Sequence, residues 1–330
     1  MFLLRPLSRA RTRSIPHCAN RPDQDTRGDC MALTTLLHAK GKALALDDAY
    51  ARSTPGSLSE KAAVKATEAI AQKIRTLQYE LYAENRQSLL IILQGLDASG
   101  KDGTIRHVLG MMNPQGCTVT GFKQPTPLES RHDFLWRIHP HVPGRGDVAI
   151  FNRSHYEDVL VAKVHQLCPK QQLALRYDQI NQFEALLRTQ NNTRVIKFFL
   201  HMSREEQLCR FAARLNDPSK HWKISMADYT ERQYWHAYQE AYALMLKKTS
   251  TDMAPWYVIP ADHKWYRNFA VASIVLETLE SMAPKLPSAN VDLDAVRAAF
   301  QQAVIDETSP DSPLRQAVKG RKAKKQSSHK

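Results

Sequence analysis

The chain has 330 residues, of which 43% are hydrophobic and 24% are charged, proportions typical of a soluble globular protein rather than a disordered or membrane-embedded one. The formal net charge of +13 lies almost wholly at the ends, because residues 1–22 hold five arginines, residues 312–330 hold seven lysines or arginines, and neither segment holds an acid. Residues 23–311 are nearly neutral, so any anion-binding site in them must come from a local cluster of basic residues.

Apolar runs and cysteines narrow the class of protein. No run of 18 apolar residues occurs, which excludes a transmembrane helix. The five cysteines are scattered and form no C-x-x-C pair, so the sequence predicts neither a zinc site nor a disulfide framework. A reducing, cytoplasmic compartment is the simplest expectation.

The two ends of the chain are expected to be disordered. Residues 1–30 are rich in arginine and poor in acids, as mitochondrial transit peptides are; alternatively, Met31 begins the folded protein and the upstream residues are an extension. The terminal VKGRKAKKQSSHK (318–330) has too little apolar content to bury. This basic tail either touches polyanions nonspecifically or is merely solvated.

Between the ends, strand and helix patterns alternate. Residues 60–84 carry apolar side chains at helical spacing, and SLLIILQ (88–94) is a continuous apolar run typical of a parallel strand buried on both faces. Four further strands are predicted at 117–122, 147–152, 194–200 and 255–260, and helices at 104–112, 155–165, 171–190, 203–215, 228–248 and 265–282. This alternation predicts an α/β fold with a central, mostly parallel sheet.

We therefore expect three regions: an N-terminal extension over 1–54, one α/β domain over 55–283, and a C-terminal helix with the basic tail over 284–330.

A phosphate-binding loop follows the first predicted strand. Residues 95–101 read G-x-x-x-x-G-K and lie between a strand and a helix, the context that a P-loop requires. Glycines let successive backbone N–H groups point at phosphate oxygens, and Lys101 adds a mobile positive charge. The predicted phosphate-binding residues of this segment are Gly95, Ala98, Ser99, Gly100, Lys101, Asp102, Gly103 and Thr104.

Two carboxylates distinguish this loop from a plain triphosphate cradle. Asp102 replaces the usual Ser or Thr after the lysine, and Asp97 lies inside the loop. A carboxylate among phosphates needs a cation, so Asp97 is predicted to bind Mg²⁺ or to position an acceptor; the alternative is a capping role within the loop.

The strand at 147–152 delivers Asn152 and Arg153 to the edge of the sheet where ligands bind. An arginine there suits a transferring phosphoryl group, although an ion pair with Glu157 is the alternative. Residues 201–223 gather basic side chains with few acids, which fits a lid over phosphates as well as a solvated basic face. The predicted lid, about residues 203–248, contributes Arg210, Arg214, Lys220 and Lys223.

Four segments together resemble the polyphosphate kinase type 2 family: GLDASGKDGT (95–104), FNRSHYEDVLV (151–161), DPSKHWKIS (217–225) and PWYVIPADHKWYRN (255–268). Their order and spacing also match, and the resemblance covers about residues 55–282. It implies a P-loop kinase-like three-layer fold with a helical lid, similar to thymidylate kinase. It also implies phosphoryl transfer between inorganic polyphosphate and a nucleotide.

The same resemblance implies the cofactor and the roles of single residues. Mg²⁺ is the expected cofactor, with Asp97 and Lys101 serving the loop and the metal. Asn152 and Arg153 lie at the reacting phosphates, with Arg210, Arg214, Lys220 and Lys223 in the lid. The expected partners are polyphosphate and a nucleoside mono- or diphosphate, with no specific nucleic acid and no membrane; a dimer or tetramer is expected.

Asn152 indicates which nucleotide accepts the phosphoryl group. Family branches restricted to diphosphates carry Asp there, whereas FNRS, NPQG (113–116) and FLWR (134–137) resemble the branch that accepts monophosphates and often diphosphates. AMP is therefore the expected acceptor, with ADP as a second one.

Two other functions remain open at this stage. An ATP-dependent nucleotide or small-molecule kinase would use the same P-loop, and donor choice separates it from a polyphosphate enzyme. A noncatalytic nucleotide- or nucleic-acid-binding module would depend on the basic ends, so it would lose its ligand if residues 1–30 and 312–330 were deleted.

Overall fold

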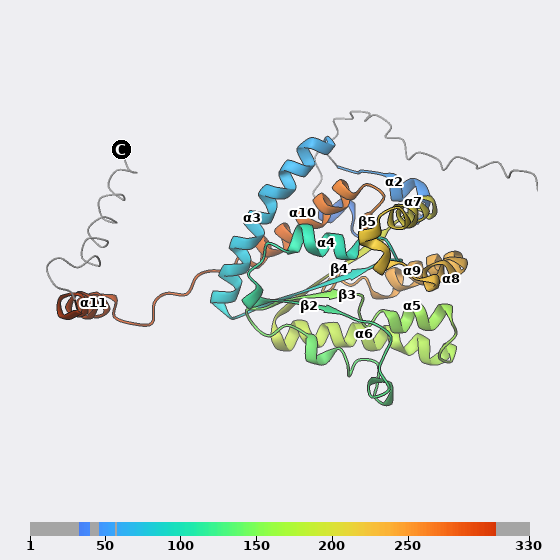
Figure 1. Ribbon diagram of the computed structural model, residues 1–330. Coiled ribbons are helices and arrows are strands. Elements are labelled where there is room, and N and C mark those ends of the chain that lie inside the picture. Colours follow the sequence, from blue (N-terminus) through green and yellow to red (C-terminus); the bar gives the residue numbers. More distant parts are fainter. Residues whose placement is uncertain (1–32, 40–45, 57, 308–330) are drawn as a thin grey trace, which may run out of the picture. The chain divides into compact units, whose positions relative to one another are not determined.

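The computed structural model describes residues 33–39, 46–56 and 58–307 (Figure 1). The expected disorder of residues 1–30 and of the basic tail falls outside these ranges. The chain divides into two compact units, Met1–Lys285 and Leu286–Lys330, and the described part of the second unit contains one helix, α11 (Leu293–Glu307).

The first unit is built on a five-stranded parallel sheet with the order β2-β3-β1-β4-β5. Its strands are β1 (Ser88–Gln94), β2 (Cys117–Gly121), β3 (Val148–Asn152), β4 (Thr193–His201) and β5 (Trp256–Pro260). All five predicted strands are confirmed, and β1 is buried along its whole length in the centre of the sheet. Its unbroken apolar run follows from this position, since side chains on both faces of the strand are covered.

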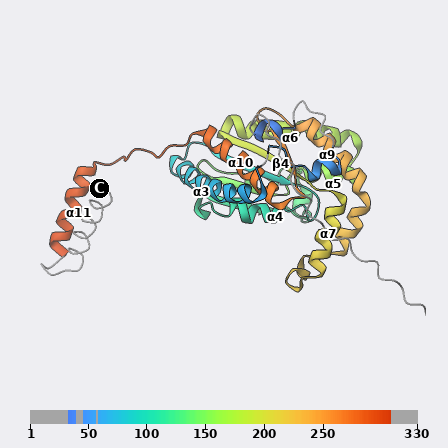
Figure 2. The ribbon, with the colours of Figure 1, turned by 90° about the horizontal axis from the view of Figure 1, so that it is seen from above.

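Helices cover both faces of the sheet, so the predicted three-layer α/β fold is confirmed (Figure 1). Leu89, Ile91 and Leu93 of β1 belong to one apolar cluster, and Leu90 and Ile92 belong to the other. The first cluster includes residues of α3 (Glu60–Glu84) and α10 (Lys264–Met282), which lie side by side in Figure 2. The second includes residues of α5 (Glu157–Val164), α6 (Lys170–Asn191) and α9 (Trp235–Thr249).

Several helices differ from the prediction. The segment predicted as one helix over 228–248 is α8 (Met226–Glu231), a 3₁₀ turn at Arg232–Tyr234, and α9. No glycine or proline marks this break; tertiary contacts flank it, with Glu231 accepting a hydrogen bond from Tyr238 and Arg232 donating to Gln207. α4 (Lys101–Thr104) continues as a π-helical turn to Leu109 and ends before 112.

Short elements complete the first unit. α7 (Arg204–Leu215) matches its prediction within a residue, whereas α1 (Leu33–Leu36) and α2 (Asp48–Arg52) were not predicted, because four or five residues show no helical periodicity. Within the described ranges, no helix is both long enough and apolar enough to span a bilayer.

Candidate active site

The P-loop joins β1 to α4 at the carboxyl edge of the sheet. Gly95 and Gly100 have φ angles of +153° and +103°, conformations that L side chains rarely adopt. Space is equally restrictive at Gly100, where a Cβ atom would lie 1.9 Å from Nη1 of Arg267. The loop therefore requires both glycines of the motif, and Arg267 is the reason at the second.

Lys101 is folded back into the loop. Its Nζ donates hydrogen bonds to the carbonyl oxygens of Gly95 at 2.6 Å and Leu96 at 3.2 Å. Burial, reinforced by the positive charge of Arg153, lowers the pKa of Lys101 to about 8, although neighbouring carboxylates act in the opposite direction. The lysine side chain thus bridges back to the start of the loop, and bound phosphates would compete with the two carbonyl oxygens for its ammonium group.

Arg153 connects the loop to the end of β3. Its backbone lies in the left-handed region with φ +62°, and its N–H donates to the carbonyl of Leu93 at 3.0 Å. Its guanidinium forms an ion pair with Asp97 and another with Glu157 at 3.0 Å. Arg153 therefore forms the Glu157 ion pair that was the alternative to a phosphate-binding role, and it also contacts the P-loop carboxylate.

The ionisation of Asp97 follows from these neighbours. Burial alone would raise its pKa, but the charges of Arg153, Lys101 and Arg214 outweigh burial and lower it. Gln207 of α7 also donates to the backbone carbonyl of Asp97 at 3.0 Å. Asp97 is thus a fixed carboxylate at neutral pH.

Asn152, at the end of β3, and Asp102, which stands where a P-loop usually has Ser or Thr, contact each other. Nδ2 of Asn152 donates to Oδ1 of Asp102 at 2.8 Å, and Nζ of Lys223 donates to the other oxygen at 3.2 Å. These hydrogen bonds and the positive charge of Lys223 lower the pKa of Asp102 despite its partial burial. The Asp102 carboxylate ties the loop helix to β3 and to the 3₁₀ segment Pro218–Lys223.

The structure places Arg210 behind the loop. Only 8% of the residue is exposed. Its guanidinium donates to Glu206 and to the backbone carbonyls of Ala98, Ser99, Ala261 and Asp262. In this arrangement Arg210 braces the P-loop backbone, which differs from the lid position expected from the sequence.

The other expected lid cations lie at different distances from the loop. Arg214 pairs with Asp228 at 3.4 Å, and its positive charge contributes, after those of Arg153 and Lys101, to lowering the pKa of Asp97. Lys220 pairs with Asp217 at 2.6 Å and is half exposed. Of the four, Arg214 and Lys223 lie close to the loop carboxylates.

Several cations lie behind the loop, among them Arg267, for which no carboxylate partner is found in the described part of the chain. Within the described ranges Arg267 forms no ion pair; it donates to Asn268 and, at 3.5 Å, to the carbonyl of Ser99. Burial and the nearby charge of Arg210 lower the pKa of Arg267 to about 9. Burial followed by the charge of Arg210 also lowers the pKa of Lys264, with Arg267 and Lys220 contributing. These side chains repel one another, so an anion beside them would be stabilised.

A cavity of about 200 Å³ opens in front of the loop. It is lined from the P-loop side by Asp97 and Arg153 and from the helical side by Gln207, Asp228, Arg232, Trp235 and Tyr238, among others. Gln207, Asp228, Arg232 and Arg267 are absent from the site residues that the sequence predicts. The sequence does hold a weak signal for two of them. Gln207 lies three residues before Arg210 on the same helix, and Arg267 falls within the fourth motif, at residues 255–268.

Comparison with known proteins places the chain in a family. The family model described as "Polyphosphate kinase 2 (PPK2)" matches residues 57–287. The chain belongs to the polyphosphate kinase 2 family. It is 47% identical over 228 residues to an AMP/ADP-polyphosphate phosphotransferase of Meiothermus ruber, covering 69% of this chain and 85% of that protein. It is 45% identical over 228 residues to an ADP-polyphosphate phosphotransferase of Rhodopseudomonas palustris, covering 66% and 78%.

Solved structures agree. The crystal structure of polyphosphate kinase 2 from Arthrobacter aurescens TC1 aligns with a TM-score of 0.79 at 42% identity, covering 83% of this chain and 98% of that one. The family expected from the four sequence motifs is confirmed, and with it the assignment of the chain as a kinase, that is, a phosphotransferase.

The carboxylates at the mouth of the loop suit a hard divalent cation. No cluster of three metal-ligating side chains is preformed among the described residues. Mg²⁺, however, commonly binds through one or two carboxylates together with substrate phosphates. Asp97 and Glu157 both line the cavity in front of the loop and supply carboxylate oxygens, so the chemistry of the site fits such an ion.

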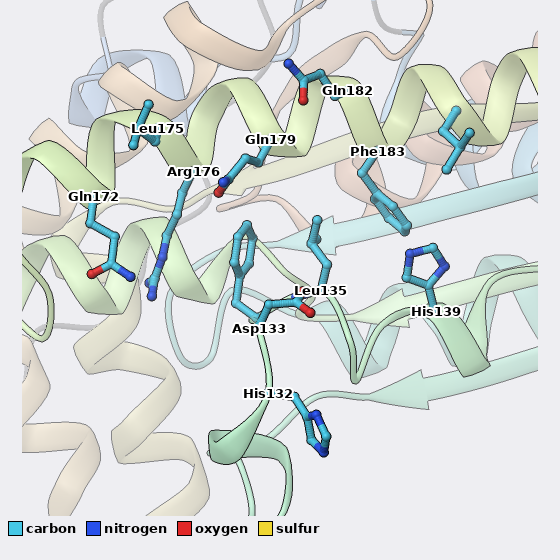
Figure 3. Close-up of a pocket in the computed structure, with 12 residues that line it drawn as sticks. His132, Asp133, Leu135, His139, Gln172, Leu175, Arg176, Gln179, Gln182 and Phe183 are labelled. Atoms are coloured by element: carbon cyan, nitrogen blue, oxygen red, sulfur yellow. The ribbon is translucent and has the colours of Figure 1, made fainter.

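A second, larger cavity of about 670 Å³ lies away from the loop, between residues 132–139 and α6 (Figure 3). His139 meets the ring of Phe183 edge-on there at 4.9 Å, and Gln172, Gln179 and Gln182 supply neutral amides. Its lining arginine, Arg176, already donates to the carbonyl of Asp158 at 2.8 Å. Phe134 and Leu135 of the FLWR segment line this second cavity and not the cavity in front of the P-loop.

Proposed function

We propose that this enzyme transfers the terminal phosphoryl group of inorganic polyphosphate to AMP, and then to ADP, in the presence of Mg²⁺. The observation that carries the proposal is the meeting of Asp97, Arg153 and Glu157 at the mouth of the P-loop, where all three line the cavity in front of it. The names of the relatives support both acceptors, since the Meiothermus ruber protein is an AMP/ADP-polyphosphate phosphotransferase and a Pseudomonas syringae relative, 36% identical over 193 residues, is a polyphosphate:AMP phosphotransferase.

In this mechanism the end of the polyphosphate chain occupies the P-loop. Lys101 exchanges its two carbonyl partners for phosphate oxygens, which are stronger acceptors because they are charged. The acceptor's terminal phosphate oxygen attacks the end phosphorus, the bond to the next phosphate breaks, and a polyphosphate one unit shorter leaves. Acceptor phosphates are already ionised at neutral pH, so no strong general base is needed.

Arg153 and Arg214 stabilise the charge that shifts during transfer. Arg153 is fixed between two carboxylates beside the loop, and its planar guanidinium can bridge two phosphate oxygens. Arg214 lies within electrostatic reach of Asp97. Asp97 would hold the Mg²⁺ ion together with substrate phosphates, and the bound ion would neutralise negative charge on the transferred group.

The charge distribution favours polyphosphate over ATP as donor. An ATP donor ends in an uncharged nucleoside, whereas a polyphosphate chain carries negative charge beyond the phosphates that the P-loop holds. Lys264 is an exposed cation near the loop, and burial followed by the positive charge of Arg210 lowers its pKa, so positive charges repel one another there. A continuing polyanion would relieve that repulsion.

The cavity in front of the loop supports a nucleotide acceptor. Trp235 and Tyr238 give it aromatic surface on which a base can stack, and Arg232 adds a positive charge. At the reacting end, Asn152 is neutral, so it places one negative charge fewer beside the acceptor phosphate than an aspartate would. This supports a monophosphate acceptor as well as a diphosphate.

The proposal is tested by a donor and acceptor matrix. The enzyme is incubated with Mg²⁺, either long-chain polyphosphate or ATP, and either AMP, ADP or GDP, and products are separated by chromatography. Formation of ADP from AMP with polyphosphate as the sole donor is expected, and Asp97→Asn should lower it while Arg297→Met, an exposed change in the second unit, should not. Turnover with ATP alone and none with polyphosphate would instead support an ATP-dependent kinase.

A further inference from the structure

A buried ion pair lies behind the residues that carry the proposed transfer. We propose that Lys197 and Glu184 act as positioning residues for Arg153 and Glu157, through the hydroxyl group of Tyr156. The inference rests on the proposed function, because its consequence for turnover is read on phosphoryl transfer.

The pair is fully enclosed. Lys197 of β4 and Glu184 of α6 have 0% and 1% of their side chains exposed. The ammonium group of Lys197 donates to Oε2 of Glu184 at 2.6 Å, to the hydroxyl oxygen of Tyr156 at 2.7 Å and to the carbonyl of Thr249 at 2.9 Å. All three of its donors are therefore used, and none is left for a substrate.

Tyr156 is the link from the pair to the site. Its hydroxyl donates to Oε1 of Glu184 at 2.8 Å while accepting from Lys197, so two charged groups fix one oxygen atom. The ring is completely buried and meets Trp256 edge-on at 4.8 Å. Tyr156 lies three residues after Arg153 and directly before Glu157, so fixing it limits the movement of both.

The turn from 153 to 157 needs such support. Arg153 has a left-handed backbone, which is unfavourable for a residue with a Cβ atom and persists only where the surroundings enforce it. Tyr156 is the N-cap residue of α5 but makes no side-chain capping bond to that helix. From the other side, Ser154 Oγ accepts from Gln94 at 3.1 Å and from the Tyr156 N–H at 3.2 Å. The turn is thus held at Ser154 by the strand that precedes the P-loop and at Tyr156 by the ion pair.

The energetics favour a positioning role over a purely stabilising one. Removing two charges from water offsets most of their attraction, so a buried pair is often no more stabilising than apolar side chains of similar volume. Lys197 and Glu184 lie beside the apolar cluster of α5, α6 and α9, where apolar side chains would pack without that cost. What apolar side chains cannot supply is a donor and an acceptor for the Tyr156 hydroxyl.

His155 is the remaining titratable neighbour of the pair. Its Nε2 lies 3.4 Å from Oε1 of Glu184, and its ring meets Phe183 edge-on at 5.6 Å. Burial lowers the pKa of His155, so the imidazole is neutral and adds no second cation to the pair.

Three variants separate positioning from stability. Tyr156→Phe removes only the hydroxyl. Glu184→Leu with Lys197→Met replaces the pair by apolar groups, and Glu184→Gln with Lys197→Met restores an acceptor for the hydroxyl without leaving a lone buried charge. Ile74→Ala, in the core on the opposite face of the sheet, is the matched control for a loss of stability alone.

We expect Tyr156→Phe and the Leu/Met pair to lower kcat by about 10- to 100-fold, the scale of a small misplacement of reacting groups, with KM for AMP changed less than about twofold. The Gln/Met pair should recover much of the loss, and Ile74→Ala should lower Tm with kcat retained. Wild-type kcat in Tyr156→Phe and in the Leu/Met pair, or kcat losses that follow Tm equally in all variants, would overturn the proposal.

Amide hydrogen exchange of the 152–160 segment supplies a readout that does not depend on the reaction. Exchange should be faster in Tyr156→Phe and in the Leu/Met pair than in wild type or Ile74→Ala. If the wild-type enzyme failed to use polyphosphate but this pattern held, the proposed function would fail and the positioning role would stand. Unchanged exchange in both variants would contradict the positioning role itself.

Discussion

Asn152 donates a 2.8 Å hydrogen bond to Asp102, joining the end of β3 to the first turn of α4. In many P-loop proteins the residue after the lysine is Ser or Thr, and an aspartate lies at the end of a neighbouring strand. Here the carboxylate belongs to Asp102 in the loop and the neutral amide belongs to Asn152 on the strand. The strand and the loop are still joined by a hydrogen bond, but the negative charge lies on the loop residue. Because Asp102 also binds Lys223, the same carboxylate connects the site to the basic 3₁₀ segment.

Asn152→Asp should change the choice of acceptor. Two carboxylates would then face each other where an amide now donates, which favours protonation or recruitment of a cation and adds negative charge beside the acceptor phosphate. Because the branches that carry Asp at this position are restricted to diphosphates, we expect kcat/KM for AMP to fall about tenfold more than kcat/KM for ADP, or ~1.4 kcal/mol of discrimination. Steady-state kinetics with both acceptors measure this, with Asn152→Ala as the variant that removes the amide without adding charge. An unchanged AMP to ADP ratio would count against the role given to Asn152.

Arg153→Met should lower turnover by about 10²- to 10³-fold, the loss expected when a preorganised charge-stabilising donor is removed. Arg153→Lys should fall between this variant and wild type, since an ammonium cannot reproduce the forked contact with Asp97 and Glu157. The pKa of Asp97 should also rise when its main cationic partner is lost, which moves the acid limb of the pH–rate profile to higher pH in Arg153→Met. Activity near wild type in Arg153→Met would remove Arg153 from the mechanism.

Deprotonation of Lys101 should make the pH–rate profile of the enzyme fall at alkaline pH. Its pKa of about 8 in the free protein means that the ammonium is lost as pH rises through that value, and a neutral amine binds phosphate weakly. kcat/KM for polyphosphate, which reports the free enzyme, should therefore fall above about pH 8. Bound phosphates favour the charged form, so the limb in kcat should lie at higher pH. The residual activity of Lys101→Arg should lack this limb, because arginine stays charged; an identical limb in that variant would assign it to another group.

Gly100→Ala should disrupt the loop. The added Cβ would lie 1.9 Å from the buried guanidinium of Arg267, and the φ of +103° is itself strained for alanine. We expect turnover to fall at least about 10²-fold, as misplaced phosphate contacts would cause. Gly121→Ala is the matched control, since a Cβ there meets nothing within 4 Å. Equal activity of the two variants, measured with polyphosphate and AMP, would contradict the tight contact between the loop and α10.

The sequence predicted the sheet and the loop better than it predicted the partners within the site. Ser88–Gln94 and Glu60–Glu84 match their predicted bounds, because an unbroken apolar run and a long helical period are local signals. The meeting of Asn152 with Asp102 joins residues 50 positions apart, which no local pattern reports. The charge of Arg210 is visible in the sequence and predicts a lid cation, whereas its five carbonyl and carboxylate contacts depend on the folded chain.

The cation cluster behind the loop shows the same limit. Arg267 carries no signal in sequence beyond its place in a motif, and its close approach to Gly100 adds a steric reason to the positive φ angle that already favours glycine there. The break between α8 and α9 is likewise absent from the prediction, because no helix-breaking residue marks it in the sequence.

The most direct test of the central claim follows both substrates at once. ³¹P NMR of the enzyme with Mg²⁺, AMP and a polyphosphate of defined length reports the phosphates of the donor and the β-phosphate of ADP in one experiment. The account predicts that ADP appears in step with shortening of the polyphosphate, and that Arg153→Met slows both signals equally. Formation of ADP while the polyphosphate stays intact, or no ADP without added ATP, would contradict it.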